Sequence, residues 1–321
     1  MGHIIAISNL KGGIGKTTTV VNIGAGLALK GARVLLVDVD AQGNLSMALN
    51  IRPRRTVYEV LVDGAAAADC ITPARPNLDL IAADHSLLGA QPIIAQRPDW
   101  SRVLERGLRP LFDQYDFILI DSGGSLTPLN VNALVCARAV IAPTAVEHFS
   151  LKGLEMLIDQ IRRVKGSAAS LRMIVPTLFD PRVRQSAELL AELQSRYGAL
   201  VAPPVRVNVR LSEAPRAGQT IYEYDPRSRG AMDYAQLVER LSEIFPFQPV
   251  HRPAPTPAPA RSQAAPAEPA PTATAQPFIR PLSQPCPNCG RPLEHATLAG
   301  YHVLYCNHCK YKTQTLVREQ R

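Results

Sequence analysis

The feature that most constrains the fold of this chain is a glycine-rich segment, Lys11–Thr18, which reads Lys-Gly-Gly-Ile-Gly-Lys-Thr-Thr. The apolar run Ile4–Ile7 precedes it and the apolar-periodic stretch Thr19–Leu29 follows it, so the pattern predicts strand, loop and helix in succession. The three glycines let the backbone turn tightly and gather several N–H groups around one small volume. The N-terminus of the following helix adds unpaired N–H groups and a partial positive charge. The segment therefore predicts a phosphate-binding loop.

The loop departs from the usual G-x-x-x-x-G-K-[ST] form, because Leu10 stands where the first glycine would be. A second lysine, Lys11, opens the loop instead. Lys11 cannot easily fold back onto the phosphates of its own loop, so we expect it to reach the nucleotide of a facing subunit. We expect Lys16 to reach the terminal phosphates and the Thr17 hydroxyl to enter a Mg²⁺ shell. The alternative is a glycine-rich turn with an incidental lysine.

Apolar strand-like runs alternate with amphipathic helical runs from residue 1 to about residue 247. The expected strands are Ile4–Ile7, Val34–Val37, Leu78–Ala82, Phe117–Ile120, Ala139–Ala142 and Met173–Thr177. Expected helices include Trp100–Phe112, Leu151–Lys165 and Ser186–Tyr197. This alternation predicts an α/β fold with a mostly parallel sheet and helices on both faces.

The composition changes abruptly after this region. Residues 249–285 are rich in proline and alanine and cannot build a core, so we expect a disordered linker there. The predicted organisation is a nucleotide-binding domain at 1–248, this linker, and a small C-terminal module at 286–321. No apolar run approaches the ~20 residues that span a bilayer, and no signal peptide is evident, so we expect a cytoplasmic protein without membrane contact. The net charge of +8 is compatible with a polyanionic partner.

Carboxylates follow two of the expected strands. Asp38 and Asp40 end the second strand, and Asp121 ends the buried strand Phe117–Ile120. Because the carboxyl ends of parallel strands lie beside the phosphate loop, we expect Asp38 and Asp121 near Mg²⁺ and Asp40 beside the attacking water. For Asp38 the alternative is a helix cap or a turn residue.

The C-terminal module contains two C-x-x-C pairs, Cys286 with Cys289 and Cys306 with Cys309, separated by 16 residues. This spacing predicts a structural zinc ribbon with four thiolate ligands, and Leu298–Leu304 is expected to form a hairpin strand between the pairs. Metal binding would supply folding energy that so short a segment cannot obtain from a core. The alternative is a redox pair.

The sequence leaves two kinds of partner for this module, nucleic acid or another protein. Nucleic acid is suggested by basic and aromatic residues near the end of the chain. These are Lys310, Lys312, Arg318, Arg321, Tyr301, Tyr305 and Tyr311.

Six segments together resemble the ParA/MinD class of deviant P-loop ATPases, and within it the ParA/Soj partitioning proteins. The resemblance covers residues 3 to about 245. The segments are Lys11–Thr18, Asp38–Asn44, Phe117–Asp121, Pro176–Arg182, and Asn208–Pro215 with Tyr224–Gly230.

The resemblance implies an ATP-bound face-to-face dimer in which Lys11 contacts the partner's nucleotide. Lys16 and Thr17 would hold phosphate and Mg²⁺, Asp40 would position the hydrolytic water, and Asn208 would lie near the adenine. The full set of expected nucleotide-binding residues is Lys11, Gly12, Gly13, Ile14, Gly15, Lys16, Thr17, Thr18 and Asn208.

The resemblance also implies partners. Members of the subgroup bind DNA without sequence preference through surface arginines, which correspond here to Arg182 and Arg210. The alternative for each arginine is an ordinary solvated side chain. A ParB-like centromere-binding protein would stimulate hydrolysis, and the protein would associate with the nucleoid.

The sequence departs from the family pattern at three places. Gly123-Gly124 replaces two prolines, Leu10 replaces a glutamine, and Arg206-Val207 replaces Pro-Arg before Asn208. Three other functions stay open: a MinD-like or cargo-positioning ATPase, a nitrogenase-reductase-like electron carrier, and a scaffold that binds ATP without turnover.

Overall fold

The structure is a computed structural model that describes residues 2–125, 127–147, 150–249, 285–298, 301–306, 308–309 and 312–316. The chain divides into two compact units, Met1–Ala254 and Pro255–Arg321, which we describe separately. Nearly all of the expected linker lies outside the described residues, and so do Lys310, Tyr311, Arg318 and Arg321.

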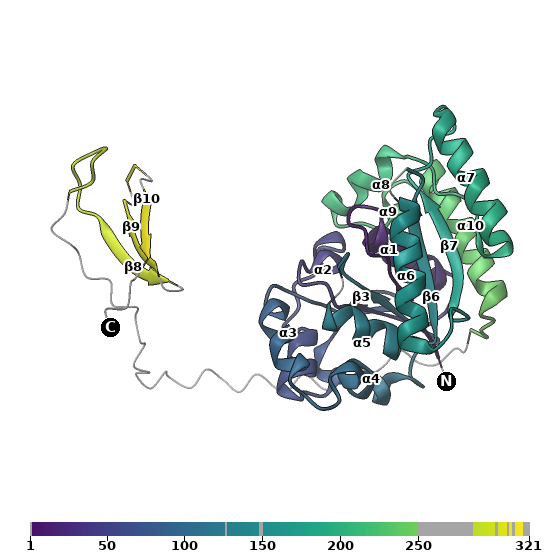
Figure 1. The fold of residues 1–321 in the computed structure, drawn as a ribbon, viewed down its shortest axis with the longest axis horizontal. Helices are drawn as coiled ribbons and strands as arrows, with labels where there is room; N and C mark the ends of the chain where they lie inside the picture. Colours follow the sequence, from purple (N-terminus) through teal and green to yellow (C-terminus); the bar gives the residue numbers. More distant parts are fainter. Residues whose placement is uncertain are drawn as a thin grey trace. The chain divides into compact units, whose positions relative to one another are not determined.

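Among the described residues, a seven-stranded sheet forms the centre of the first unit (Figure 1). Its strand order is β3-β4-β2-β5-β1-β6-β7. Every neighbouring pair is parallel except β3 with β4, which is antiparallel. The strands are β1 (His3–Ile7), β2 (Val34–Asp38), β3 (Ile71–Arg75), β4 (Leu78–Ile81), β5 (Phe117–Asp121), β6 (Ala139–Ala145) and β7 (Leu171–Thr177). The mostly parallel α/β fold is therefore confirmed.

Helices cover both faces of this sheet. The α-helices are α1 (Lys16–Leu29), α2 (Asn44–Ala48), α3 (Leu87–Ala95), α4 (Val103–Leu108), α5 (Pro128–Cys136), α6 (Ser150–Lys165), α7 (Arg184–Tyr197), α8 (Val209–Glu213), α9 (Ile221–Tyr224) and α10 (Arg229–Ile244). Shorter turns are η1 (Glu59–Asp63), η2 (Ala67–Cys70), η3 (Trp100–Arg102), η4 (Arg109–Leu111), η5 (Gly198–Leu200) and η6 (Ala214–Ala217).

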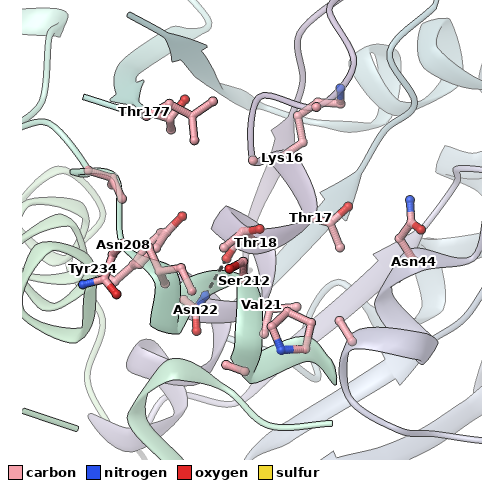
Figure 2. A pocket seen from close by; sticks show the side chains of 18 of the residues that line it. Lys16, Thr17, Thr18, Val21, Asn22, Asn44, Thr177, Asn208, Ser212 and Tyr234 are labelled. Atoms are coloured by element: carbon pink, nitrogen blue, oxygen red, sulfur yellow. Dashed lines mark hydrogen bonds between the residues drawn. The ribbon is translucent and has the colours of Figure 1, made fainter. Parts of the chain in front are cut away.

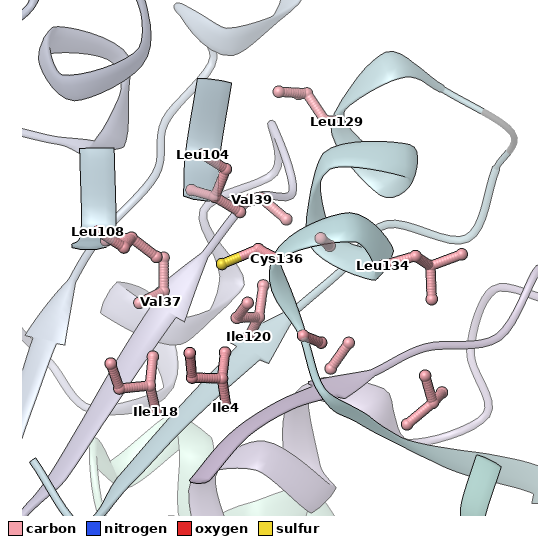
Figure 3. Close-up of a cluster of buried hydrophobic side chains, with 14 of the residues drawn as sticks. Ile4, Val37, Val39, Leu104, Leu108, Ile118, Ile120, Leu129, Leu134 and Cys136 are labelled. Carbon is pink, nitrogen blue, oxygen red and sulfur yellow. The ribbon is translucent and has the colours of Figure 1, made fainter. Parts of the chain in front are cut away.

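Two buried clusters, one on each face of the sheet, make up the core of this unit. Successive residues of a strand point to opposite faces, so Ile4 belongs to one cluster and Ile5 to the other. The first cluster joins the sheet to α3–α7, and Figure 3 shows its part around Cys136 of α5. The second joins the sheet to α1, α2, α9 and α10. Burial on both faces explains why the strands are almost entirely apolar.

Two elements of this unit differ from what the sequence predicted: one expected helix is divided, and one strand was not predicted. The expected helix Trp100–Phe112 is divided into η3, α4 and η4, and Pro110, which has no N–H to donate, lies in the last of these turns. The edge strand β3 was not predicted, because it contains a proline and is only partly buried. Within the described part of the chain, no helix has both the length and the hydrophobicity that crossing a membrane requires.

The second unit contains three antiparallel strands, in the order β10-β9-β8, within its described residues. They are β8 (Glu294–Leu298), β9 (Tyr301–Tyr305) and β10 (Lys312–Leu316). The expected single strand Leu298–Leu304 was wrong, because β8 ends and β9 begins inside that range.

Candidate active site

The glycine-rich loop joins β1 to α1 and opens onto a cavity of about 670 Å³. Gly13 and Gly15 have φ angles of 73° and 85°, which is a left-handed backbone conformation that residues other than glycine rarely adopt. A Cβ atom added to Gly12 or Gly13 would meet nothing within 4 Å. These glycines leave the cavity side of the loop open to a ligand that approaches the backbone.

Lys16 is the first residue of α1, and its side chain folds back over the loop. Its Nζ donates a hydrogen bond to the carbonyl oxygen of Lys11 at 2.8 Å. Burial lowers the pKa of Lys16, while Asp121 and Asp40 act in the opposite direction. A buried ammonium group therefore lies at the cavity wall next to two carboxylates, where it can bind a phosphate oxygen.

Thr17 and Asp121 form a pair of oxygen donors although 104 residues separate them in the sequence. The Thr17 hydroxyl donates to Asp121 Oδ2 at 2.7 Å. The other oxygen, Oδ1, is buried and has no hydrogen-bond partner among the described residues. Burial raises the pKa of Asp121 to about 7. A hydroxyl beside a carboxylate with one unused oxygen is a donor set that fits Mg²⁺.

Asp38 and Asp40 differ in their surroundings. Asp38 is fully buried, and its two oxygens accept hydrogen bonds from the backbone N–H groups of Asp40 at 2.9 Å and Leu45 at 3.1 Å. Burial, together with Asp121, holds the pKa of Asp38 well above its ordinary value. Asp40 lines the cavity and accepts one hydrogen bond from the backbone of Gln42. Asp38 thus orients the loop that carries Asp40, and a direct role at the metal stays a prediction.

Lys11 forms an ion pair with Glu147, just after β6. The backbone N–H of Lys11 also donates to Asn9 Oδ1 at 3.2 Å, and Asn9 is tied to the carbonyl oxygen of Pro143 at 2.7 Å. The front of the loop is therefore anchored to the end of β6. That Lys11 reaches a second subunit stays a prediction.

The far wall of the cavity comes from the end of β7 and from the segment that leads into α8. Figure 2 shows Thr177 and Asn208 in the same view as Lys16, Thr17 and Thr18. The Thr177 hydroxyl donates to the carbonyl oxygen of Ile14 at 2.8 Å, which ties the phosphate loop to β7. We did not predict Thr177 as a site residue, although its place at the end of a predicted strand was a usable signal.

Asn208 lines the cavity, and its side chain also caps α8. Its Oδ1 accepts a hydrogen bond from the backbone N–H of Arg210 at 2.8 Å. Tyr234 of α10, which is also labelled in Figure 2, pairs with the Thr19 hydroxyl at 3.2 Å. Tyr234 and Asn22 also line the cavity, and no sequence motif marked either residue.

Arg182 and Arg210 are exposed, and each has acidic neighbours. Arg182 donates two hydrogen bonds to Asp180, and 85% of its side chain is exposed. Arg210 pairs with Glu213 at 2.9 Å and with Asp225 at 3.4 Å. Their accessibility is compatible with contact to phosphates, but their charges are partly neutralised.

The four cysteines of the second unit converge on one point. Their sulfur atoms all lie within 4.8 Å of one another, with 3.4 Å between Cys286 and Cys309 and 3.5 Å between Cys289 and Cys306. Backbone N–H groups of Cys309 and His308 lower the pKa of the Cys306 thiol to about 6. Four thiolates around a tetrahedral zinc are about 3.8 Å apart, so this donor set fits zinc.

Comparison with known proteins gives matches over most of the first unit. A family model described as AAA domain matches residues 2–173, more than half of the chain. The sporulation initiation inhibitor protein Soj of Bacillus subtilis is 41% identical over 252 residues, which cover 75% of this chain and 99% of that protein.

Two solved structures have a similar fold. Cobyrinic acid a,c-diamide synthase from Mycobacterium smegmatis, with bound ATP analogue and magnesium, matches with a TM-score of 0.65 and 30% identity over 75% of this chain and 94% of that one. The cell division ATPase MinD of Pyrococcus furiosus matches with a TM-score of 0.64 and 25% identity, over 76% of this chain and 100% of that one. Together with the loop, the paired oxygen donors and the sheet order, these similarities show that the chain belongs to the ParA/MinD family of P-loop ATPases.

Proposed function

We propose that this chain is a ParA/Soj-type partitioning ATPase that hydrolyses ATP to ADP and phosphate. The observation that carries the proposal is the Thr17–Asp121 pair at 2.7 Å, whose unused Asp121 oxygen is buried next to Lys16. These residues would hold Mg²⁺, which neutralises phosphate charge when it is bound. The N–H groups of residues 12–18 surround the phosphates, and Lys16 binds a terminal oxygen.

Asp40 has the position of a water-orienting carboxylate in this scheme. It lines the cavity, and one of its oxygens is fixed by the backbone of Gln42 at 3.1 Å. The loop that carries it is held by the buried Asp38. An acceptor held in this way can orient a water molecule toward the terminal phosphate, which is the usual catalytic device in phosphoryl transfer.

Replacement of Asp40 tests this role. We expect Asp40→Ala to reduce ATP turnover by at least about tenfold, because the water loses its acceptor, while ATP binding is retained. Turnover is measured by phosphate release and binding by calorimetry. Asp84→Ala is the control, because Asp84 makes a similar turn to Ser86 without lining the cavity. Normal turnover in Asp40→Ala would exclude the assigned role.

We further propose that two ATP-bound subunits form a sandwich dimer that binds DNA without sequence preference, and that a ParB-like partner stimulates hydrolysis and release. Lys11 would contact the nucleotide of the partner subunit. Arg182 and Arg210 support the DNA proposal, since both are exposed and arginine–phosphate contacts are independent of sequence. Association with the nucleoid would follow.

Replacement of Arg210 tests the DNA surface. We expect Arg210→Ala to weaken binding to plasmid DNA several-fold at moderate salt, because one phosphate contact is lost. Dimerisation with ATP should be unaffected. Arg102→Ala is a matched control, since Arg102 is also exposed and also pairs with a glutamate three residues on. An unchanged DNA affinity would contradict the assignment.

The second unit is part of the same proposal. We propose that residues 286–321 form a module around one structural zinc ion, held by Cys286, Cys289, Cys306 and Cys309, and that residues 249–285 link it to the ATPase domain at 1–248. The cluster of four sulfur atoms supports the zinc.

A second candidate function is a MinD-like or cargo-positioning ATPase whose C-terminal module docks a protein. The similarity to the fold of MinD and the presence of the cysteine cluster favour this candidate. Co-sedimentation with liposomes and with plasmid DNA, each with and without ATP, separates the two. Binding to liposomes but not to DNA would favour the second candidate.

A further inference from the structure

An ion pair between a partly exposed arginine and a buried carboxylate is part of the wall of the nucleotide cavity. Asp233 of α10 is only 4% exposed, and its partner, Arg206, lines the cavity. Arg206 Nη2 lies 2.5 Å from Asp233 Oδ1, and Nε lies 3.1 Å from both carboxylate oxygens. The backbone N–H of Arg206 donates to Oδ2 at 3.0 Å. One residue therefore supplies all the hydrogen bonds that the described structure gives this carboxylate.

The backbone of Arg206 is fixed as well. Its neighbours, Val205 and Val207, continue the hydrogen-bonding pattern of the sheet past the end of β7. Val205 donates to the carbonyl oxygen of Pro176 at 2.7 Å, and Val207 donates to that of Phe179 at 2.9 Å. The Arg206 side chain is thus held at its backbone end by the strand contacts and at its guanidinium end by Asp233. About a third of it, 36%, stays exposed. Such a group is preorganised for a ligand rather than free to sample many rotamers.

One part of the guanidinium group is left for a ligand. The edge formed by Nε and Nη2 faces Asp233, whereas no described residue accepts a hydrogen bond from Nη1. A guanidinium group has five N–H donors in a rigid plane, so the hydrogens on Nη1 and the flat face remain available. Both can recognise a nucleobase, by donation to a ring nitrogen or by stacking.

The surroundings of Arg206 suit a base better than phosphates. The apolar residues Leu178, Val205 and Leu211 line the cavity together with Arg206. The groups that fit phosphate and Mg²⁺ lie at the ends of β1 and β5, whereas Arg206 lies beside the end of β7, which β6 separates from β1 in the sheet. The phosphate-binding groups and Arg206 are therefore at different parts of the cavity.

We propose that Arg206, held by Asp233, contacts the purine base of the bound nucleotide and contributes to the selection of that base. The proposal rests on the proposed ATP binding. It also gives a physical reason for one departure from the family pattern, since the arginine in place of proline has a dedicated buried carboxylate in α10.

Ligands with and without a base test the proposal. Calorimetry measures the binding of Mg-ATP and of magnesium tripolyphosphate to the full chain. We expect Arg206→Met to weaken ATP binding about tenfold, the equivalent of ~1.4 kcal/mol, and to leave tripolyphosphate binding unchanged. Arg206→Lys keeps a charge beside Asp233 but loses the planar group, so ATP binding should weaken here too. Arg184→Met, which removes an exposed arginine paired with Glu188, is the control.

A second variant separates base recognition from folding. Arg206→Met leaves a buried carboxylate unpaired, which is destabilising. The double variant Arg206→Met with Asp233→Asn removes that charge, and it should show the same selective loss of ATP binding with a thermal unfolding midpoint closer to that of the wild-type chain. Wild-type affinity for ATP in the variants, or an equal loss of affinity for both ligands, would overturn the proposal. Failure of the wild-type chain to bind ATP would overturn the proposed function as well.

Discussion

At the scale of single residues, Gly124 explains how the loop after β5 meets the phosphate loop. A Cβ atom at this position would lie 3.1 Å from the backbone nitrogen of Gly12 and 3.3 Å from the carbonyl carbon of Lys11. These are backbone atoms of the loop itself, so they cannot move aside as the end of a flexible side chain would. The absence of a side chain at Gly124 therefore lets the two loops come into contact.

We expect Gly124→Val to weaken ATP binding by about tenfold, because the larger side chain displaces the phosphate loop from its binding geometry. Gly124→Ala should have a smaller effect in the same direction. Calorimetric titration with Mg-ATP measures both. Gly89→Ala serves as the control, because a Cβ atom at Gly89 in α3 would meet nothing within 4 Å. Equal ATP affinity in Gly124→Val and the wild-type chain would show that this contact is not needed.

Local sequence predicted the residues of the site that belong to a motif, and it missed those that depend on distant partners. Thr17 was predictable because it belongs to the glycine-rich motif at the start of α1, and Asp121 because it ends a buried strand. The contact of Thr177 with Ile14 joins residues 163 positions apart, and no spacing rule marks such a pair. Asp38 shows a different limit, since the sequence could not tell a metal ligand from a residue that holds backbone N–H groups.

At the scale of elements, α1 lies unusually close to its neighbours. A Cβ atom at Gly26 would lie 2.6 Å from Val238 of α10 and 2.8 Å from the hydroxyl of Tyr222 in α9. A Cβ atom at Gly24 would lie 2.7 Å from Leu36 of β2. The glycines that lower the intrinsic helix propensity of α1 therefore permit its close packing.

We expect Gly26→Ala to lower the free energy of unfolding by about 1–3 kcal/mol, although alanine is the better helix former. The added methyl group has to displace Val238 or Tyr222. Chemical denaturation followed by circular dichroism gives the value, and Gly89→Ala is again the control. If Gly26→Ala were as stable as wild type or more so, helix propensity would outweigh packing at this position.

The elements that sequence patterns predicted are those with one strong signal, which is either a continuous apolar run or a helical periodicity. The central strands were predictable because they are buried on both faces. The edge strand β3 has partly exposed residues and a proline, so its pattern is weak. The stretch from Trp100 has helical periodicity, but Pro110 limits its backbone hydrogen bonds, and periodicity alone does not reveal such an interruption.

At the scale of the whole molecule, the two units depend on different forces. The first has two extensive apolar clusters, whereas the described core of the second consists of little more than cysteines and leucines. With so small a core among its described residues, this unit would gain the stability it needs from the proposed metal. The two units should therefore respond differently to loss of metal.

We expect the purified chain to contain about one zinc ion, measured by mass spectrometry of the metal. Cys306→Ser should lose most of this zinc, while ATP binding by the first unit stays unchanged. Cys70→Ser, which replaces a buried thiol of the first unit, should keep the zinc. A wild-type chain without metal, or a Cys306→Ser chain with full zinc content, would contradict the proposed module.

The register of the sheet fixes the position of Asp121 at the end of β5. Asp121 is aligned with Ile7 on one side and with Asp38 on the other, and the rest of β5 is buried between two apolar layers. A slip of one residue would move Asp121 by about 3.3 Å and turn it toward the opposite face. The precision with which Asp121, the proposed metal ligand, is placed therefore depends on the packing of the apolar side chains around β5. Conservative substitutions in the core around β5 should therefore shift the position of Asp121, and so lower the rate of ATP hydrolysis, before they unfold the protein.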